Sequence, residues 1–128
     1  LYHGHSFSGN ALAAAVALRH LQLFEELEVL ANVRDRAAQL HERLSELAID
    51  NPAIKVVRQR GLMVGVELNP PADDLRWGRR VCAASVERGV LLRPLGDVVV
   101  IMPILTSTAD EIDRIVDVLA ASITEVCS

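Results

Sequence analysis

Two runs of β-favouring residues, separated by one glycine, restrict the fold of this chain more than any other feature. Residues 54–60 and 62–68 are rich in valine, isoleucine and leucine, and Gly61 lies between them. A glycine at such a point permits a tight turn or a bulge. We therefore expect two neighbouring strands in the middle of the chain.

Helical patterns precede these strands. The segment from Asn10 to about Glu26 is rich in alanine and leucine, with small side chains on nearly all sides, so we expect a buried helix. A second helix should run from about Val29 to Ala48 and end at Asn51-Pro52, because proline cannot continue a helix. The apolar stripe of this helix consists of Leu30, Val33, Ala37, Leu40, Leu44 and Leu47.

Two more helices and two more strands are predicted after the central pair. A third helix should span about 75–88 and end at Gly89, and strands at 90–92 and 98–102 should flank the turn formed by residues 93–96. Thr108-Ala-Asp-Glu111 has the capping-box pattern and predicts the start of a last helix. The inward positions of the third helix are Trp77, Val81, Ala84 and Val86. The order ααββαββα predicts an α/β fold in which helices cover a small sheet.

Composition excludes several classes of protein. A chain of 128 residues with 51% hydrophobic side chains is long enough for one domain with a real core. Its net charge of −4 offers no basic surface for a phosphate backbone, so we expect no nucleic-acid partner. No apolar run approaches the roughly 20 residues that cross a bilayer, and we expect no membrane partner. The isolated thiols of Cys82 and Cys127 indicate a reducing compartment, so we expect a cytoplasmic protein.

The segment His3-Gly-His-Ser-Phe-Ser-Gly-Asn10 places small and hydroxylated residues just before the first helix. The hydroxyls of Ser6 and Ser8, with free N–H groups at a helix N-terminus, are suited to bind a phosphate. On spacing alone, a plain turn at Ser6 and a helix cap at Ser8 or Asn10 are the better interpretations. His3 and His5 form an H-x-H pair, but no acidic residue or cysteine lies nearby to complete a metal site, so we expect no metal.

Arg93 is the second candidate site residue. The proline and glycine that follow it in Arg93-Pro-Leu-Gly96 hold the chain in a rigid turn. A guanidinium fixed in this way presents a planar fork that matches a carboxylate. The alternative is a surface arginine in an exposed ion pair, which is the commoner state of an arbitrary arginine.

The segments YHGHSFSGNALAAAVAL and RGVLLRPLGDVVVIMPILTSTADEI resemble the C-terminal part of the class III, fold-type I pyridoxal-phosphate aminotransferases. The HG-x-[ST]-[FY]-x-GN loop and the RP-[LF]-G turn are typical of the members that act in biotin synthesis. The resemblance covers essentially the whole chain. It implies that residues 1–26 form a cofactor-phosphate loop and an interdomain helix, and that residues 27–128 form the C-terminal small domain.

The resemblance also implies roles for individual residues. Ser6, with His5 contributing mainly backbone, would bind the phosphate of pyridoxal 5′-phosphate across the interface of a homodimer, and Gly4 would let substrate approach closely. Arg93 would bind the carboxylate of 8-amino-7-oxononanoate, which the members that act in biotin synthesis convert to 7,8-diaminononanoate. S-adenosylmethionine, or lysine in some relatives, would donate the amino group.

Catalysis requires a lysine that forms the Schiff base with the cofactor. The chain has one lysine, Lys55, in a predicted strand after the loop, whereas the family's catalytic lysine precedes the loop. The chain also begins at Leu1, inside the loop. We therefore expect a fragment whose cofactor domain lies upstream and which is inactive alone. Two alternatives remain open: another class III aminotransferase acting on an ω-amine, and a non-enzymatic α/β regulatory or interaction domain.

Overall fold

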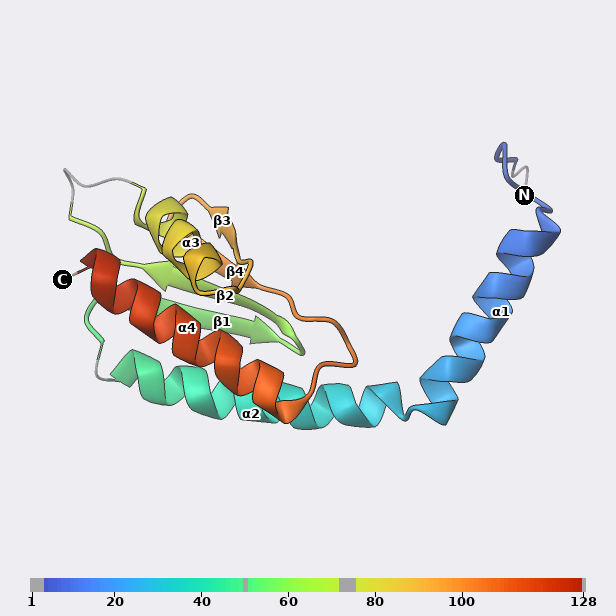
Figure 1. Cartoon of the computed structure of the whole chain (residues 1–128), viewed down its shortest axis with the longest axis horizontal. Helices are drawn as coiled ribbons and strands as arrows, with labels where there is room; N and C mark the ends of the chain where they lie inside the picture. Colours follow the sequence, from blue (N-terminus) through green and yellow to red (C-terminus); the bar gives the residue numbers. More distant parts are fainter. Residues whose placement is uncertain (1–3, 50, 72–75, 128) are drawn as a thin grey trace.

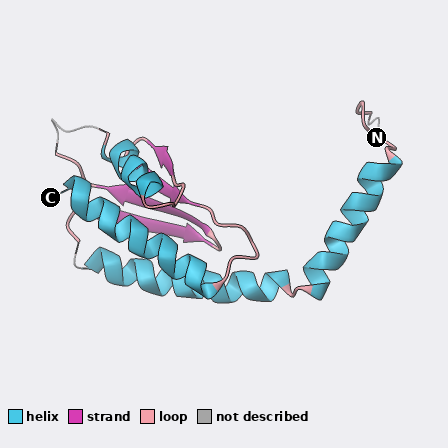
Figure 2. Cartoon of the chain, viewed as in Figure 1, coloured by secondary structure: helices cyan, strands magenta, loops and turns pink. Residues whose placement is uncertain are grey.

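The computed structural model describes residues 4–49, 51–71 and 76–127. Its elements follow the predicted order ααββαββα (Figures 1 and 2). They are α1 (Ala11–Glu26), α2 (Val29–Ile49), β1 (Ile54–Arg60), β2 (Met63–Leu68), α3 (Trp77–Glu87), β3 (Arg93–Leu95), β4 (Val98–Ile101) and α4 (Ala109–Cys127). The prediction of an α/β fold is confirmed.

The four strands form one antiparallel sheet in the order β1-β2-β4-β3. β1 and β2 are the two runs on either side of Gly61, whose φ of +57° is the left-handed conformation that glycine adopts without strain. The pairing has an irregularity between Ile54 and Val56. The central hairpin is therefore the one that the sequence predicts.

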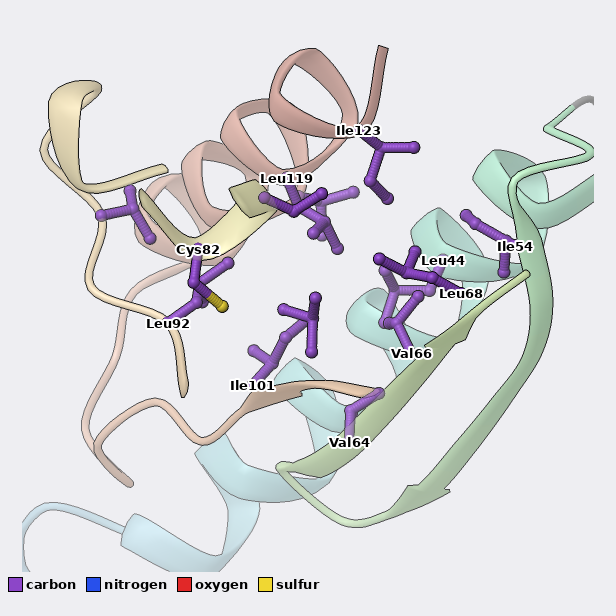
Figure 3. Close-up of a cluster of buried hydrophobic side chains, with 14 of the residues drawn as sticks. Leu44, Ile54, Val64, Val66, Leu68, Cys82, Leu92, Ile101, Leu119 and Ile123 are labelled. Atoms are coloured by element: carbon purple, nitrogen blue, oxygen red, sulfur yellow. The ribbon is translucent and has the colours of Figure 1, made fainter. Parts of the chain in front are cut away.

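Helices α2, α3 and α4 cover one face of this sheet, as Figures 1 and 2 show. α2 packs on β1, α3 packs on β3 and β4, and α4 packs on both of these helices. Side chains from the helices and the sheet point toward one another in the core between them (Figure 3). The fully buried members of this core include Leu40, Leu44, Val66, Val99, Ile101, Ile112, Leu119 and Ile123.

The capping box at the start of α4 is present with both of its hydrogen bonds. The Thr108 N–H donates to Glu111 Oε2 at 2.8 Å, and the Glu111 N–H donates to Thr108 Oγ1 at 3.3 Å. These bonds satisfy two backbone donors that an uncapped helix would leave unpaired. The end of α3 also agrees with the sequence, because Gly89 follows the helix with a left-handed φ of +81°.

The third strand lies later in the chain than the sequence suggested. Residues 90–92 are not a strand, and β3 is formed instead by Arg93–Leu95, which was expected to be a turn. Val90 is held by the end of α3, where its N–H donates to the Ser85 carbonyl at 3.0 Å. Pro94 is tolerated in β3 because the strand lies at the edge of the sheet, where a missing N–H donor leaves no ladder bond broken.

The expectation that the first helix is buried is wrong for this chain. No residue of α1 is buried, and the helix projects away from the sheet and the other helices (Figure 1). Leu30 in α2 and Val86 in α3 were also expected to face inward, yet both are exposed. The apolar side chains of α1 lie all around the helix, so no single stripe directs it onto the core.

Candidate functional site

The N-terminal loop closes on itself through His5 and Ser8. The Ser8 N–H donates to the His5 carbonyl at 2.9 Å, and the His5 N–H donates to Ser8 Oγ at 3.1 Å. Asn10 then caps α1, because its Oδ1 accepts a hydrogen bond from the Ala13 N–H at 3.0 Å. Of the capping residues considered from the sequence, the structure selects Asn10, and Ser8 supports the loop instead.

Ser6 lies at the exposed tip of this turn. Its hydroxyl has no hydrogen-bond partner among the described residues, unlike that of Ser8. Gly4 is also exposed, and a Cβ at its position would meet nothing within 4 Å. The first-turn amides of a helix lack carbonyl partners within that helix, and the loop that carries Ser6 precedes this end of α1.

Arg93 begins β3 and pairs with Val100 of β4. The next pair is Pro94 with Val99, and Val99 is fully buried under the helices. Because successive side chains of a strand point to opposite faces, the Arg93 side chain lies on the face that the helices leave open. It is exposed, and it forms no ion pair with any residue that the structure describes. The guanidinium is therefore available to a ligand.

Two further arginines lie near this strand. A surface hollow beside the β3–β4 turn is lined by Arg76, Arg79, Pro94, Gly96 and Asp97. The sequence analysis did not single out Arg76 or Arg79, because no local pattern links the start of α3 to a turn almost twenty positions later. Their position near Arg93 follows only from the fold, because α3 packs on β3.

The chain does not bring its two candidate site regions together. The loop that carries Ser6 lies at the free end of α1, and β3 lies in the compact body formed by the sheet and the other helices (Figure 1). The chain therefore forms no single site from these two regions.

The remaining polar candidates serve the fold. Lys55 Nζ lies 2.8 Å from Glu67 Oε1, and Arg58 also binds this carboxylate. Hydrogen bonds from Lys55 and Arg58 hold the pKa of Glu67 below its usual value. Cys82 is a free, buried cysteine, and burial raises the pKa of its thiol to about 11.

No group of three metal-ligating side chains occurs within residues 4–49, 51–71 and 76–127, and His3 lies outside this part of the chain. Over the same ranges, no helix combines the length and the apolar character that a bilayer crossing requires.

Comparison with known proteins decides the family. The sequence matches the family described as Aminotransferase class-III over residues 1–123. This chain belongs to the class III aminotransferases. The resemblance inferred from its two motifs is thereby confirmed, and class III aminotransferases in general depend on pyridoxal phosphate.

The curated relatives include several enzymes with the same name and other aminotransferases with different names. The chain is 44% identical to the adenosylmethionine-8-amino-7-oxononanoate aminotransferase of Geobacter sulfurreducens, over 95% of this chain and 28% of the relative. It is 39% identical to the ornithine aminotransferase of Staphylococcus carnosus, over 87% of this chain and 26% of the relative. The chain therefore spans less than a third of the length of these relatives.

Solved structures show the same relation. The adenosylmethionine-8-amino-7-oxononanoate aminotransferase of Methanocaldococcus jannaschii superimposes with a TM-score of 0.85 at 34% identity, over 98% of this chain and 30% of that one. A transaminase solved with L-alanine superimposes with a TM-score of 0.90 at 36% identity, over 98% of this chain and 31% of that one. The fold described above is therefore one part of a class III transaminase.

Proposed function

We propose that this chain is the C-terminal part of a pyridoxal-phosphate-dependent aminotransferase that converts 8-amino-7-oxononanoate to 7,8-diaminononanoate in biotin synthesis. The observation that carries the proposal is the exposed guanidinium of Arg93, which has no ion pair in the described residues and is fixed on an edge strand. The similarity to relatives named for this substrate supports it. The amino donor is S-adenosylmethionine or lysine, and the protein is a cytoplasmic homodimer.

In this proposal Arg93 binds the carboxylate of the acceptor. A guanidinium holds a carboxylate through two parallel N–H···O bonds and stays charged at every physiological pH. The acceptor is thereby anchored at one end, and its carbonyl end is directed toward the cofactor. The arginine positions substrate and takes no part in proton transfer.

Ser6 binds the cofactor phosphate. Its free hydroxyl and the amides at the start of α1 fit a phosphate group, and the partial positive charge of the helix N-terminus stabilises the anion. His5 contributes by shaping the loop, because its backbone N–H and carbonyl both bond to Ser8. Gly4 leaves open space beside the loop for substrate. When bound, pyridoxal phosphate supplies the electron sink for transamination.

The loop serves the active site of the partner subunit in the proposed homodimer. Phe7 and most apolar residues of α1 are exposed in this chain, which is the state expected of a segment that packs against protein outside it. The catalytic lysine belongs to the upstream part of the protein, because Lys55 is held on the open face of the sheet by Glu67. The chain alone is therefore inactive.

A second candidate is an aminotransferase for another ω-amine. The similarity to ornithine aminotransferase and to the diaminobutyrate–2-oxoglutarate transaminase of Halomonas elongata favours it. Membership in the class III family argues against an unrelated regulatory domain.

The test uses Arg93→Ala, Arg93→Lys and Ser6→Ala in the full-length protein, with each half-reaction followed by single-turnover cofactor absorbance. Arg93→Ala should cost about 2–5 kcal/mol in the acceptor half-reaction, since it leaves a desolvated carboxylate without a partner. Arg93→Lys should restore only part of this loss. Ser6→Ala should instead raise the cofactor dissociation constant about ten- to a hundredfold and leave acceptor preference unchanged.

Arg60→Ala is the matched control, because Arg60 is another exposed arginine of the same sheet. It should leave both half-reactions unchanged. An unchanged acceptor half-reaction in Arg93→Ala would remove the substrate assignment and favour the second candidate. Unchanged cofactor affinity in Ser6→Ala would reduce Ser6 to a turn residue.

A further inference from the structure

A close backbone contact joins the start of α3 to the turn between β3 and β4. Gly78 lies in the first turn of α3 and is buried. A Cβ at this position would overlap the carbonyl oxygen of Gly96 and would lie 3.1 Å from Asp97 Cα. Both neighbours are backbone atoms, which cannot swing aside as the end of a side chain can. The contact therefore requires glycine at position 78.

The same contact includes a polar interaction. The Gly78 N–H donates to Asp97 Oδ1 at 3.4 Å. Gly78 lies at the N-terminal end of α3, where backbone donors lack partners within the helix. Gly96, with a φ of +60°, forms the turn with Asp97. The start of α3 thus holds both residues of the turn.

This turn determines where Arg93 lies. β3 has three residues and lies at the edge of the sheet, so within the described residues β4 is its one strand neighbour. The other element that packs on β3 is α3. A shift of the turn away from Gly78 would move the short strand, and with it the guanidinium at its first residue.

We propose that Gly78 is a positioning residue for Arg93. By allowing α3 to approach Gly96 and Asp97, it fixes the height and direction of the guanidinium over the open face of the sheet. Gly78 touches no substrate and acts only through the turn. This inference rests on the proposed role of Arg93 as the carboxylate ligand.

The experiment is a double-mutant cycle with Gly78→Ala and Arg93→Ala in the full-length protein, measured on the acceptor half-reaction. A displacement of about 1 Å at a positioning group can lower a rate by about a hundredfold, so we expect Gly78→Ala to lower acceptor kcat/KM by about ten- to a hundredfold. In the Arg93→Ala background, the same substitution should cause no further loss, because the group that it misplaces is gone.

Two controls separate positioning from general damage. Gly61→Ala places alanine at a left-handed φ of +57° in the β1–β2 turn, with no neighbour within 4 Å of the new Cβ, so it should lower stability and leave acceptor kcat/KM unchanged. Amide hydrogen exchange of Arg93 and of residues 95–97 should become faster in Gly78→Ala and stay unchanged in Gly61→Ala. If Gly78→Ala does not fold, Gly96→Ala replaces it in the cycle, because it strains the same turn without overlapping any neighbour.

Equal losses from Gly78→Ala in both backgrounds would overturn the proposal, since they would show a purely structural effect. Full acceptor activity in Gly78→Ala, with activity lost in Arg93→Ala, would also overturn it while leaving the proposed function intact. Full activity in Arg93→Ala would contradict the proposed function itself, and the role of Gly78 with it.

Discussion

Helices α1 and α4 are both long and rich in apolar residues, yet the chain buries one and leaves the other exposed. α4 has 19 residues and places Ile112, Val116, Leu119 and Ile123 in the core, whereas α1 has 16 residues and buries none. The apolar residues of α4 form one stripe, and those of α1 surround the helix. Apolar content alone therefore does not tell whether a helix is buried within its own chain; a one-sided stripe does.

The two candidate site residues lie in different regions, one in the compact unit and one at the free end of the exposed helix α1. Arg93 is held by the sheet and α3, inside the compact unit formed by α2 to α4 and the four strands. Ser6 lies in the loop at the free end of α1. The proposed carboxylate ligand thus lies within the compact unit, and the proposed phosphate loop lies outside it.

We expect the largest difference between α4 and α1 when one leucine of each helix is replaced by alanine and the free energy of unfolding is compared. Leu119→Ala in α4 should lower the free energy of unfolding of the 128-residue chain by about 2–5 kcal/mol, because it opens a cavity in the core. Leu21→Ala in α1 should change it by less than about 0.5 kcal/mol, since Leu21 is exposed. Urea denaturation followed by circular dichroism measures both. Similar losses for the two variants would mean that α1 belongs to the cooperative unit.

The helix caps offer a second, smaller contrast. Thr108→Ala should lower the free energy of unfolding by about 1 kcal/mol, because it removes one bond of the capping box of α4. Asn10→Ala removes the equivalent bond of α1 and should leave that free energy unchanged while reducing helical content. The same denaturation experiment reports on both. A cost at Asn10 equal to that at Thr108 would contradict the division.

The smallest expected effect is a pH dependence of stability caused by Glu67 on the open face of the sheet. Hydrogen bonds from Lys55 and Arg58 lower the pKa of Glu67 from its usual value, so its stabilising contribution is present above the unfolded pKa and is lost as pH falls through the folded pKa. The chain should therefore lose a little stability on acidification. Glu67→Gln should reduce this dependence, and added salt should weaken it because the pair is near solvent. An NMR titration of Glu67 that shows an ordinary midpoint would refute the assignment.

Local signals in the sequence predicted the parts of the fold that local chemistry determines. The hairpin around Gly61, the capping box at Thr108 and the glycine after α3 all depend on residues within a few positions of one another. The position of β3 depends instead on its pairing with β4 and on α3, so propensity placed a strand at 90–92 and a turn at Arg93–Leu95. The exposure of α1 follows from apolar residues that surround the helix and give it no single stripe to pack on the core.

The site was predictable only in part. Ser6 and Arg93 could be named from two motifs through a family resemblance, whereas their spacing alone favoured a turn and a surface ion pair. Arg76, Arg79 and the contact at Gly78 became visible only when the fold placed the start of α3 beside the β3–β4 turn. Such contacts join residues far apart in the sequence, and no local pattern encodes them.

Amide hydrogen exchange, resolved along the chain, tests the division between the two regions most directly. An isolated helix of this length is marginal in water, so in the 128-residue chain we expect little protection over residues 4–26 and strong protection in α2, α4 and the central strands. In the full-length protein, residues 4–26 should become protected as α1 packs against the rest of the protein. Protection of residues 4–26 equal to that of α4 in a monomeric 128-residue chain would contradict the account.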